Sequence, residues 1–175
     1  MSGLSSAPYD LGRSTGVCAV TGEALTPGTE AVAVLVEREQ DDQLERLDYG
    51  AEAWDRGERP ARLFCFWRRR IPSPNERPKP FIDDDELVAL FDQLQDAEQD
   101  RQIAFRFILS LILIRKRLLR HVGSETDAEG RAVSLLKRKG AAPDDEPIAV
   151  IDPGMDESAI ASATELLGQA LRGDG

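Results

Sequence analysis

The chain has 175 residues, and 41% of them are hydrophobic, which suits one domain with a real core and excludes a wholly disordered chain. The 32 acidic residues outnumber the 22 Lys and Arg, and the resulting net charge of −10 disfavours a general nucleic-acid binder, which must neutralise phosphates. The sequence has no basic start followed by an apolar run, so no secretory signal is predicted, and the two cysteines are expected to be reduced thiols. We therefore expect a cytoplasmic protein.

The N-terminal part is predicted to be a sheet that follows a tail. Residues 1–15 are rich in Ser and Gly and are expected to form a flexible tail, and residues 16–72 to form an antiparallel β subdomain. Four short strands are expected in succession with no long crossover helix between them, which favours a meander. The strands are predicted at Val17–Val20, Ala31–Val36, Leu44–Tyr49 and the aromatic-rich stretch 62–70, with a helical turn at Ala51–Trp54.

A proline-rich connector, residues 73–82, is predicted between this sheet and the helical part. The next helix has a clear start, because Asp83 is a suitable N-cap and Glu86 stands three residues later as its capping-box partner. The run of acids at 83–85 is explained by this cap and by the helix dipole. The apolar face of this helix is predicted to be Leu87, Leu90, Phe91 and Leu94.

The longest apolar segment, Gln102–Val122, is predicted to be one helix of about six turns, and the rest of the chain is expected to pack around it. With the preceding helix it would form an αα-hairpin. Its uncharged run, Phe107–Ile114, has 8 residues against the roughly 20 needed to cross a bilayer, so no membrane span is predicted.

The C-terminal part is predicted to contain a short β-hairpin and a last helix. The hairpin strands are expected at Ala132–Leu136 and Ile148–Ile151, after a polar loop, and Asp156 is the predicted N-cap of the helix. The whole is an α+β fold: an N-terminal antiparallel sheet of about four strands, an αα-hairpin with a long buried helix, a β-hairpin and a C-terminal helix. Residues 83–175 are expected to pack as one domain with the sheet.

The turn that begins at Cys18 is the most suggestive local motif. A zinc knuckle places two thiolates on a tight turn, usually C-x-x-C followed by Gly, but here Thr21 stands in the place of the second thiol. Cys18 and Cys65 are the only thiol candidates for a metal, and two small buried thiols in a β core are the alternative. His121 is the only histidine, which excludes a His-based metal cluster, and no cofactor is predicted.

Nothing in the sequence points to catalysis. It contains no G-x-S-x-G, no P-loop and no G-x-G-x-x-G, and no Ser or Thr has a recognisable histidine base. An enzyme would need a pocket that collects Asp48, Tyr49, His121 or the cysteines.

Two basic stretches are the candidate binding residues. If Phe64 and Phe66 fill the core, Trp67 faces out, and Trp and Arg commonly anchor protein interfaces. The alternative is that Trp67 packs under Trp54 or under a helix. The second stretch ends the predicted central helix, where it is either a phosphate-meeting surface or a solvated helix end. The candidates are Trp67, Arg68, Arg69, Arg70, Arg115, Lys116 and Arg117.

Three longer patterns occur together: C-x-x-T-G-x-x-L-x-P-G from Cys18 to Gly28, L-D-Y-x-x-x-A-W from Leu47 to Trp54, and F-W-R-x-R-x-P from Phe66 to Pro72. With them the chain resembles small uncharacterised bacterial proteins of planctomycete type. The C-x-x-T-G start is also similar to half of a degenerate zinc ribbon. The resemblance implies no activity, ligand or catalytic residue.

We therefore expect a non-enzymatic interaction protein, an adaptor or regulatory subunit, that binds another protein through an exposed Trp/Arg surface. The alternative is an RNA- or ribosome-associated factor derived from a zinc ribbon, which requires contiguous basic patches and a steep salt dependence. A small enzyme of unknown type is the second alternative. No membrane partner is expected, and a dimer is possible.

Overall fold

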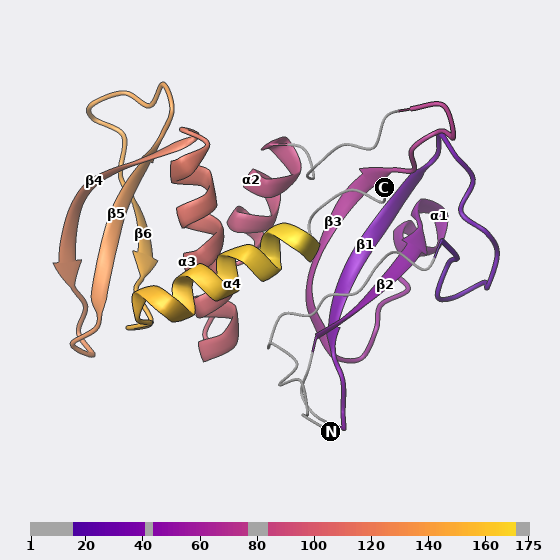
Figure 1. Ribbon diagram of the computed structural model, residues 1–175, viewed down its shortest axis with the longest axis horizontal. Helices are drawn as coiled ribbons and strands as arrows, with labels where there is room; N and C mark the ends of the chain where they lie inside the picture. Colours follow the sequence, from indigo (N-terminus) through magenta and orange to yellow (C-terminus); the bar gives the residue numbers. More distant parts are fainter. Residues whose placement is uncertain (1–15, 41–43, 77–83, 171–175) are drawn as a thin grey trace. The chain divides into compact units, whose positions relative to one another are not determined.

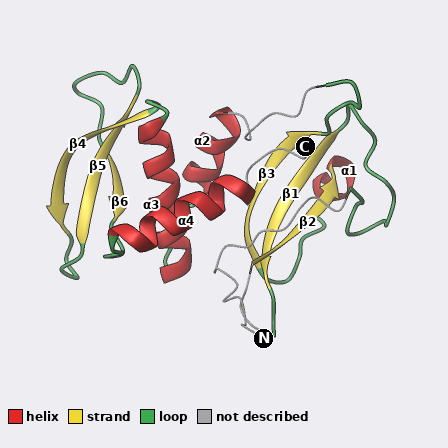
Figure 2. Cartoon of the chain, viewed as in Figure 1, coloured by secondary structure: helices red, strands yellow, loops and turns green. Residues whose placement is uncertain are grey.

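The computed structural model describes residues 16–40, 44–76 and 84–170, and the side chains within these ranges as far as Thr164. The described part has an α+β fold with two three-stranded antiparallel sheets and four helices (Figures 1 and 2). In chain order the elements are β1 (Glu30–Glu37), β2 (Leu44–Gly50), α1 (Ala51–Asp55), β3 (Leu63–Arg70), α2 (Asp84–Gln93), α3 (Asp100–Arg115), β4 (Leu119–Thr126), β5 (Ala132–Arg138), β6 (Ile148–Ile151) and α4 (Glu157–Ala170).

The chain divides into two compact units. The first consists of Met1–Leu90 and Glu165–Gly175, and the second of Phe91–Thr164. The boundaries fall inside α2 and α4, not in the proline-rich stretch 73–82. Each unit contains one of the two sheets.

The first sheet has the strand order β2-β1-β3, with β1 in the centre. Every residue of Ala31–Val36 is buried, so both faces of the central strand are covered. On one face, the valines of β1 pack with Tyr49 and Trp54, and α1 contacts β1 and β2 on this side (Figure 1). The rings of Tyr49 and Trp54 meet edge to face with centroids 5.5 Å apart.

The opposite face of the first sheet is lined by Ala31, Ala33 and Leu35 and contains polar side chains. The antiparallel register places Asp48 and Trp67 on either side of Ala33, and it places Arg46 and Cys65 on either side of Leu35. All four of these flanking residues are buried. This face is therefore a second interior layer and not a solvent-facing surface.

The predicted first strand, Val17–Val20, is not a strand. Val17 makes a single antiparallel bridge with Ala24, and the residues between them form a tight turn in which Gly22 has φ 71° and its N–H donates to the Cys18 carbonyl at 2.8 Å. The N-terminal sheet thus has three strands rather than about four. The apolar run Val17–Val20 is short, and it leads directly into Thr21-Gly22, which forms a turn instead of continuing a strand.

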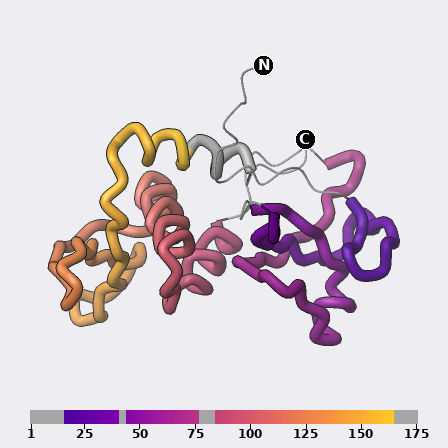
Figure 3. Tube along the Cα trace, turned by 90° about the horizontal axis from the view of Figure 1, so that it is seen from below, coloured from indigo at the N-terminus to yellow at the C-terminus, as the bar shows by residue number. Residues whose placement is uncertain are grey.

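In the second unit, α3 packs against the sheet β4-β5-β6, and both views place the helix beside the sheet (Figures 1 and 3). The predicted extension of this helix to Val122 is wrong, because α3 ends at Arg115. Arg117 N–H donates to Ile114 O and Leu118 N–H donates to Leu113 O, both at 2.9 Å. These two bonds define a Schellman motif, with Arg117 at φ 63° where glycine usually stands.

The chain that leaves this cap forms β4, a strand that the sequence did not predict. The expected hairpin is therefore part of a three-stranded sheet, although its own two strands, β5 and β6, lie where they were predicted. A turn closed by Asp127 connects β4 to β5, with the Asp127 carboxylate accepting from the N–H groups of Glu129 and Arg131. These bonds hold the pKa of Asp127 below its usual value.

Arg106 is the charged residue in the middle of α3, and it is 7% exposed. Its Nη1 donates to Ala149 O at 2.8 Å, its Nε donates to Phe91 O at 3.4 Å, and its guanidinium lies 4.5 Å from the Phe91 ring centre. Burial lowers the pKa of Arg106, while the nearby Asp92 and Asp96 oppose that shift. The residue joins α3 to β6 and to the end of α2.

The predicted apolar residues Leu87, Leu90 and Phe91 of α2 are all buried, and so is Leu94, which follows the end of the helix. Asp156 caps α4 as predicted, accepting a bond from Ala159 N–H at 2.7 Å, whereas the predicted cap Asp83 and the tail at 1–15 lie outside the described residues. Among the described residues, no helix combines the length and the apolarity that a membrane crossing requires.

Candidate functional site

The structure corrects the predicted Trp/Arg surface at Trp67. This residue is 3% exposed, so it cannot anchor a partner at the surface. Its neighbours Cys65 and Leu35 belong to the second interior layer, and the Arg46 guanidinium lies 5.6 Å from the Trp67 ring centre. The alternation of side chains between the two faces of β3 was predicted, but both faces of the strand are covered around Trp67.

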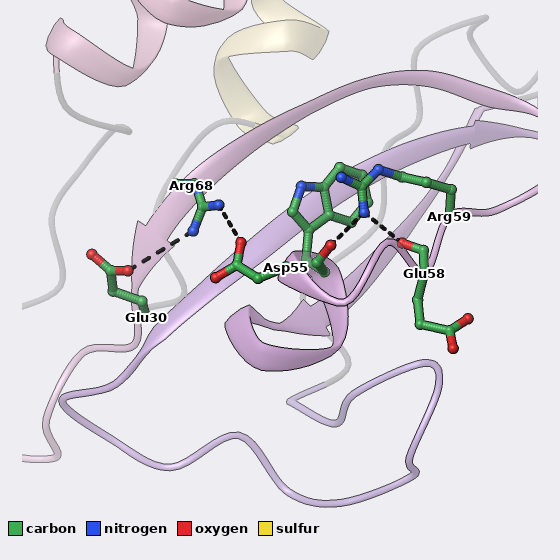
Figure 4. Close-up of polar contacts among 6 residues, drawn as sticks. Glu30, Asp55, Glu58, Arg59 and Arg68 are labelled. Atoms are coloured by element: carbon green, nitrogen blue, oxygen red, sulfur yellow. Dashed lines mark hydrogen bonds and ion pairs between the residues drawn. The ribbon is translucent and has the colours of Figure 1, made fainter.

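The arginines that follow Trp67 are engaged by carboxylates within the first unit. Arg68 lies between Asp55, whose Oδ1 is 2.6 Å away, and Glu30, whose Oε2 is 3.9 Å away (Figure 4). Arg70 pairs with Glu76 at 2.9 Å. Arg69 is only half-buried and also has a polar or electrostatic partner. These charges are mostly neutralised locally, which leaves little basic surface here for another molecule.

An arginine stacked on Trp54 covers the valine-lined face of the first sheet. Arg59 lies with its guanidinium 3.6 Å from the Trp54 ring centre, and its Nη1 donates to the carbonyls of Trp54 and Glu58 (Figure 4). A guanidinium on an indole face is a favourable cation–π arrangement. Arg59 therefore acts as a cover for the Trp54 core cluster.

The second interior layer contains a buried ion pair. Arg46 Nη2 lies 3.4 Å from Asp48 Oδ1, and both side chains are almost fully buried. Arg46 Nε and Trp67 Nε1 have no hydrogen-bond partner within the described part of the chain. Both of these nitrogens are donors, so the layer has spare capacity for an acceptor such as an ordered water.

The Cys18 turn is held by hydrogen bonds to the thiol and to its backbone. Gly50 N–H donates to Cys18 Sγ at 3.2 Å, and Cys18 N–H donates to Glu23 O at 2.8 Å. Burial raises the pKa of Cys18, but the hydrogen bonds from Gly50, Thr21 and Val20 outweigh it, so the net pKa lies below the usual value. The turn stabilises a thiolate with the chain's own donors.

The second thiol does not join the first. Cys65 lies opposite Leu35, whereas Cys18 lies beside Gly50, which pairs with Ala31 four residues along β1, about 13 Å away. Burial raises the pKa of Cys65 well above its usual value. The described residues contain no group of three or more His, Cys, Asp or Glu that could hold a metal ion.

Of the residues that an enzyme pocket would have to collect, Cys18 and Tyr49 lie within electrostatic reach of each other, and Cys18 raises the pKa of Tyr49 in addition to the larger effect of burial. Asp48 and Tyr49 are consecutive on β2 and point to opposite faces of the first sheet. His121 belongs to the second unit, where its Nε2 lies 3.1 Å from Ser124 Oγ on exposed β4.

The second predicted basic stretch lies at the surface, and the fold brings further basic residues, from the end of β5, close to it in the chain's strand pairing. Arg115, Lys116 and Arg117 are exposed at the end of α3. The β4–β5 register pairs Leu119 with Arg138, and Lys139 N–H donates to Leu118 O at 2.9 Å. This pairing brings the end of β5 to the end of α3. We call the result the basic cluster, and it consists of Arg115, Lys116, Arg117, Lys137, Arg138 and Lys139.

The six charges of the basic cluster differ in how they are compensated. Arg138 pairs with Asp92 at 2.5 Å, and Lys137 Nζ donates to the carbonyls of Ala142 and Pro143. Arg115, Arg117 and Lys139 are exposed and have no side-chain partner within the described residues. These three cations are therefore available to an external anion.

No protein-family model matches the chain, and no match was found among curated proteins or solved structures. The likeness to planctomycete-type proteins and to a zinc ribbon therefore remains an expectation from the motifs, and function has to be argued from the site.

Proposed function

We propose that this chain is a non-enzymatic interaction protein that binds an acidic segment of another protein through the basic cluster of the second unit. The predicted class of function is retained, but the binding surface moves from Trp67 to the end of α3. Arg115, Arg117 and Lys139 supply the contacts, since their charges are not compensated within the described chain.

The observation that carries the proposal is the backbone conformation of Arg117. Its φ of 63° lies in the left-handed region, which costs a non-glycine residue roughly 1–2 kcal/mol. A Schellman cap at this place is satisfied best by glycine. The Schellman cap requires the left-handed conformation but not an arginine, and residues strained in this way cluster at functional sites. The strained residue here is an exposed arginine of the basic cluster.

The chemistry of the cluster favours a carboxylate-bearing protein over a nucleic acid. The net charge of −10 repels an extended polyphosphate, whereas a short acidic segment needs only local attraction. Stacking on bases requires exposed aromatic rings. The large exposed hydrophobic residues of the described part are Val17, Val20 and Val122, and none of them is aromatic.

The test is a pull-down with tagged protein from a lysate of the source cells, carried out with and without nuclease and read by mass spectrometry. Arg115→Glu and Lys139→Glu reverse single charges in the basic cluster. Arg56→Glu is the matched control, because Arg56 is an exposed arginine on the first unit whose side chain has no partner among the described residues. Each substitution changes the net charge by the same amount.

We expect a protein that survives nuclease treatment, is lost with both cluster variants and at raised salt, and is retained by Arg56→Glu. Recovery that disappears with nuclease would replace the proposal by the RNA-associated alternative. Recovery of the same proteins by all three variants would show that the basic cluster is not the binding surface.

A further inference from the structure

Arg138 is the one arginine of the basic cluster that is paired with a carboxylate in the described part of the chain. Its Nη2 lies 2.5 Å from Oδ1 of Asp92, which belongs to the last turn of α2. The two side chains are 44% and 43% exposed, so both groups of the pair can be reached from solvent. An acidic segment that docks on the basic cluster therefore meets a cation that already holds a carboxylate.

The strand register explains why Arg138 meets the end of α2. Cross-strand partners lie on the same face of a sheet, and Arg138 lies opposite Leu119, which is buried. Leu136, two residues earlier on the same face of β5, is also buried. Arg138 thus leaves the sheet from its covered face, at the end of the strand, and Asp92 compensates its charge there.

Asp92 also lies within electrostatic reach of a second arginine. Asp92 and Asp96 both favour the charged form of the buried Arg106 and oppose the lowering of its pKa by burial. Arg106 donates to two backbone carbonyls through Nη1 and Nε, while its Nη2 has no hydrogen-bond partner among the described residues. A carboxylate that is displaced from Arg138 therefore keeps a counter-charge nearby.

Displacing Asp92 requires little free energy, but more than a single free carboxylate supplies. An exposed ion pair of this kind changes an equilibrium by about two- to fivefold. Because Asp92 is tethered to the same chain, its carboxylate competes at a high effective concentration. A segment with several adjacent acids gains further contacts with Arg115, Arg117 and Lys139, whose charges are not compensated within the described chain. These additional contacts drive the exchange.

We propose that Asp92 is a specificity-determining residue of the basic cluster, an internal carboxylate that a multiply acidic segment of the partner displaces from Arg138. On binding, one carboxylate of the segment pairs with Arg138, and its neighbours pair with the uncompensated cations, while Asp92 remains beside Arg106. Asp92 thereby lowers the affinity for every acidic segment and weakens binding of a lone acid below a useful level. The inference rests on the proposed function and adds to it the residue that sets the affinity.

The experiment measures binding of a fluorescein-labelled hexaglutamate peptide to the full chain by fluorescence anisotropy. The proteins are wild type, Asp92→Asn, Arg138→Gln and the double variant. Asp96→Asn is the matched control, because it removes an exposed carboxylate that also acts on Arg106 but is not paired with Arg138. Arg115→Glu reports on the proposed function by itself.

We expect Asp92→Asn to bind hexaglutamate about two- to fivefold more tightly than wild type and more tightly than Asp96→Asn, since Arg138 is then free in the unbound protein. In the Arg138→Gln background, Asp92→Asn should lose this advantage, because no guanidinium is released. An equal gain with and without Arg138 would show a general field effect and overturn the proposal. A gain no larger than that of Asp96→Asn would overturn it as well.

Failure of this inference and failure of the proposed function give different results. If Arg115→Glu weakens binding while Asp92→Asn binds like wild type, the basic cluster remains the binding surface and only the exchange at Arg138 is refuted. If neither wild type nor Asp92→Asn binds hexaglutamate, both proposals fall together. Urea unfolding of each variant verifies the fold, and Asp92→Asn should keep a midpoint near that of wild type because the pair is half exposed.

Discussion

Replacing Arg117 by glycine tests the strained helix end. The left-handed conformation of a non-glycine residue costs roughly 1–2 kcal/mol, and the greater freedom of glycine in the unfolded chain returns roughly 0.5–1 kcal/mol of that. Arg117→Gly should therefore stabilise the second unit by about 0.5–1 kcal/mol. In the same variant, binding of the acidic partner should weaken, because a cation of the basic cluster is lost.

The assay is urea unfolding followed by far-ultraviolet circular dichroism, because both tryptophans lie in the first unit and their fluorescence does not report on the second. Arg117→Ala loses the same charge but keeps the strain, so its stability should stay near that of wild type. Arg115→Gly, two residues earlier at the last position of α3, should lower stability, by at most about 1 kcal/mol. If Arg117→Gly is no more stable than Arg117→Ala, the argument from backbone strain is refuted.

Three further substitutions test the interior. Trp67→Ala should lower the free energy of unfolding by about 3–5 kcal/mol, whereas Trp67→Phe should cost much less because the indole N–H has no partner in the described part; equal losses in urea unfolding would contradict this. The pKa of Cys18 is lowered on folding, so the stability advantage of wild type over Cys18→Ser should grow as the pH rises from that lowered value towards the ordinary 9.0, and an advantage that shrinks would refute it. Arg106→Ala should cost about 3 kcal/mol in thermal unfolding, since a buried charged hydrogen bond and a ring contact are lost, and a loss below about 1 kcal/mol would show that the carbonyls are otherwise satisfied.

The strands of the first sheet could be predicted because their composition is decisive. Between its terminal glutamates β1 is an uninterrupted apolar run of Ala, Val and Leu, and β3 is dense in aromatics, so each can be predicted as a strand without tertiary information. What the alternation along β3 could not show is how many layers cover the sheet. A period of two separates the faces, but the burial of Trp67 depends on what packs against its face.

The end of α3 was mispredicted for a different reason. Helix ends are normally marked by Gly or Pro, but here the left-handed position is filled by Arg117, and the apolar Leu118 and Leu119 continue the helical pattern beyond it. When the helix is predicted to continue past Arg117, the residues of β4 are assigned to the helix and the strand is missed.

The basic cluster was half visible in the sequence. Arg115, Lys116 and Arg117 are consecutive and were candidates, but Lys137–Lys139 join them only through the register of β4 with β5. Strand register is a non-local property, so no local signal identified the second half of the cluster. The same holds for the edge of β4, which exists only once the strand is recognised.

The burial of β1 on both faces determines where slow hydrogen exchange should be found. Its backbone is bonded on both sides, to β2 and to β3, so its amide protons reach solvent only when the whole first unit opens. Their exchange rates therefore report the free energy of that global opening. The amides of the edge strand β4 that point away from β5 should exchange quickly, because no second strand within the described residues bonds to them.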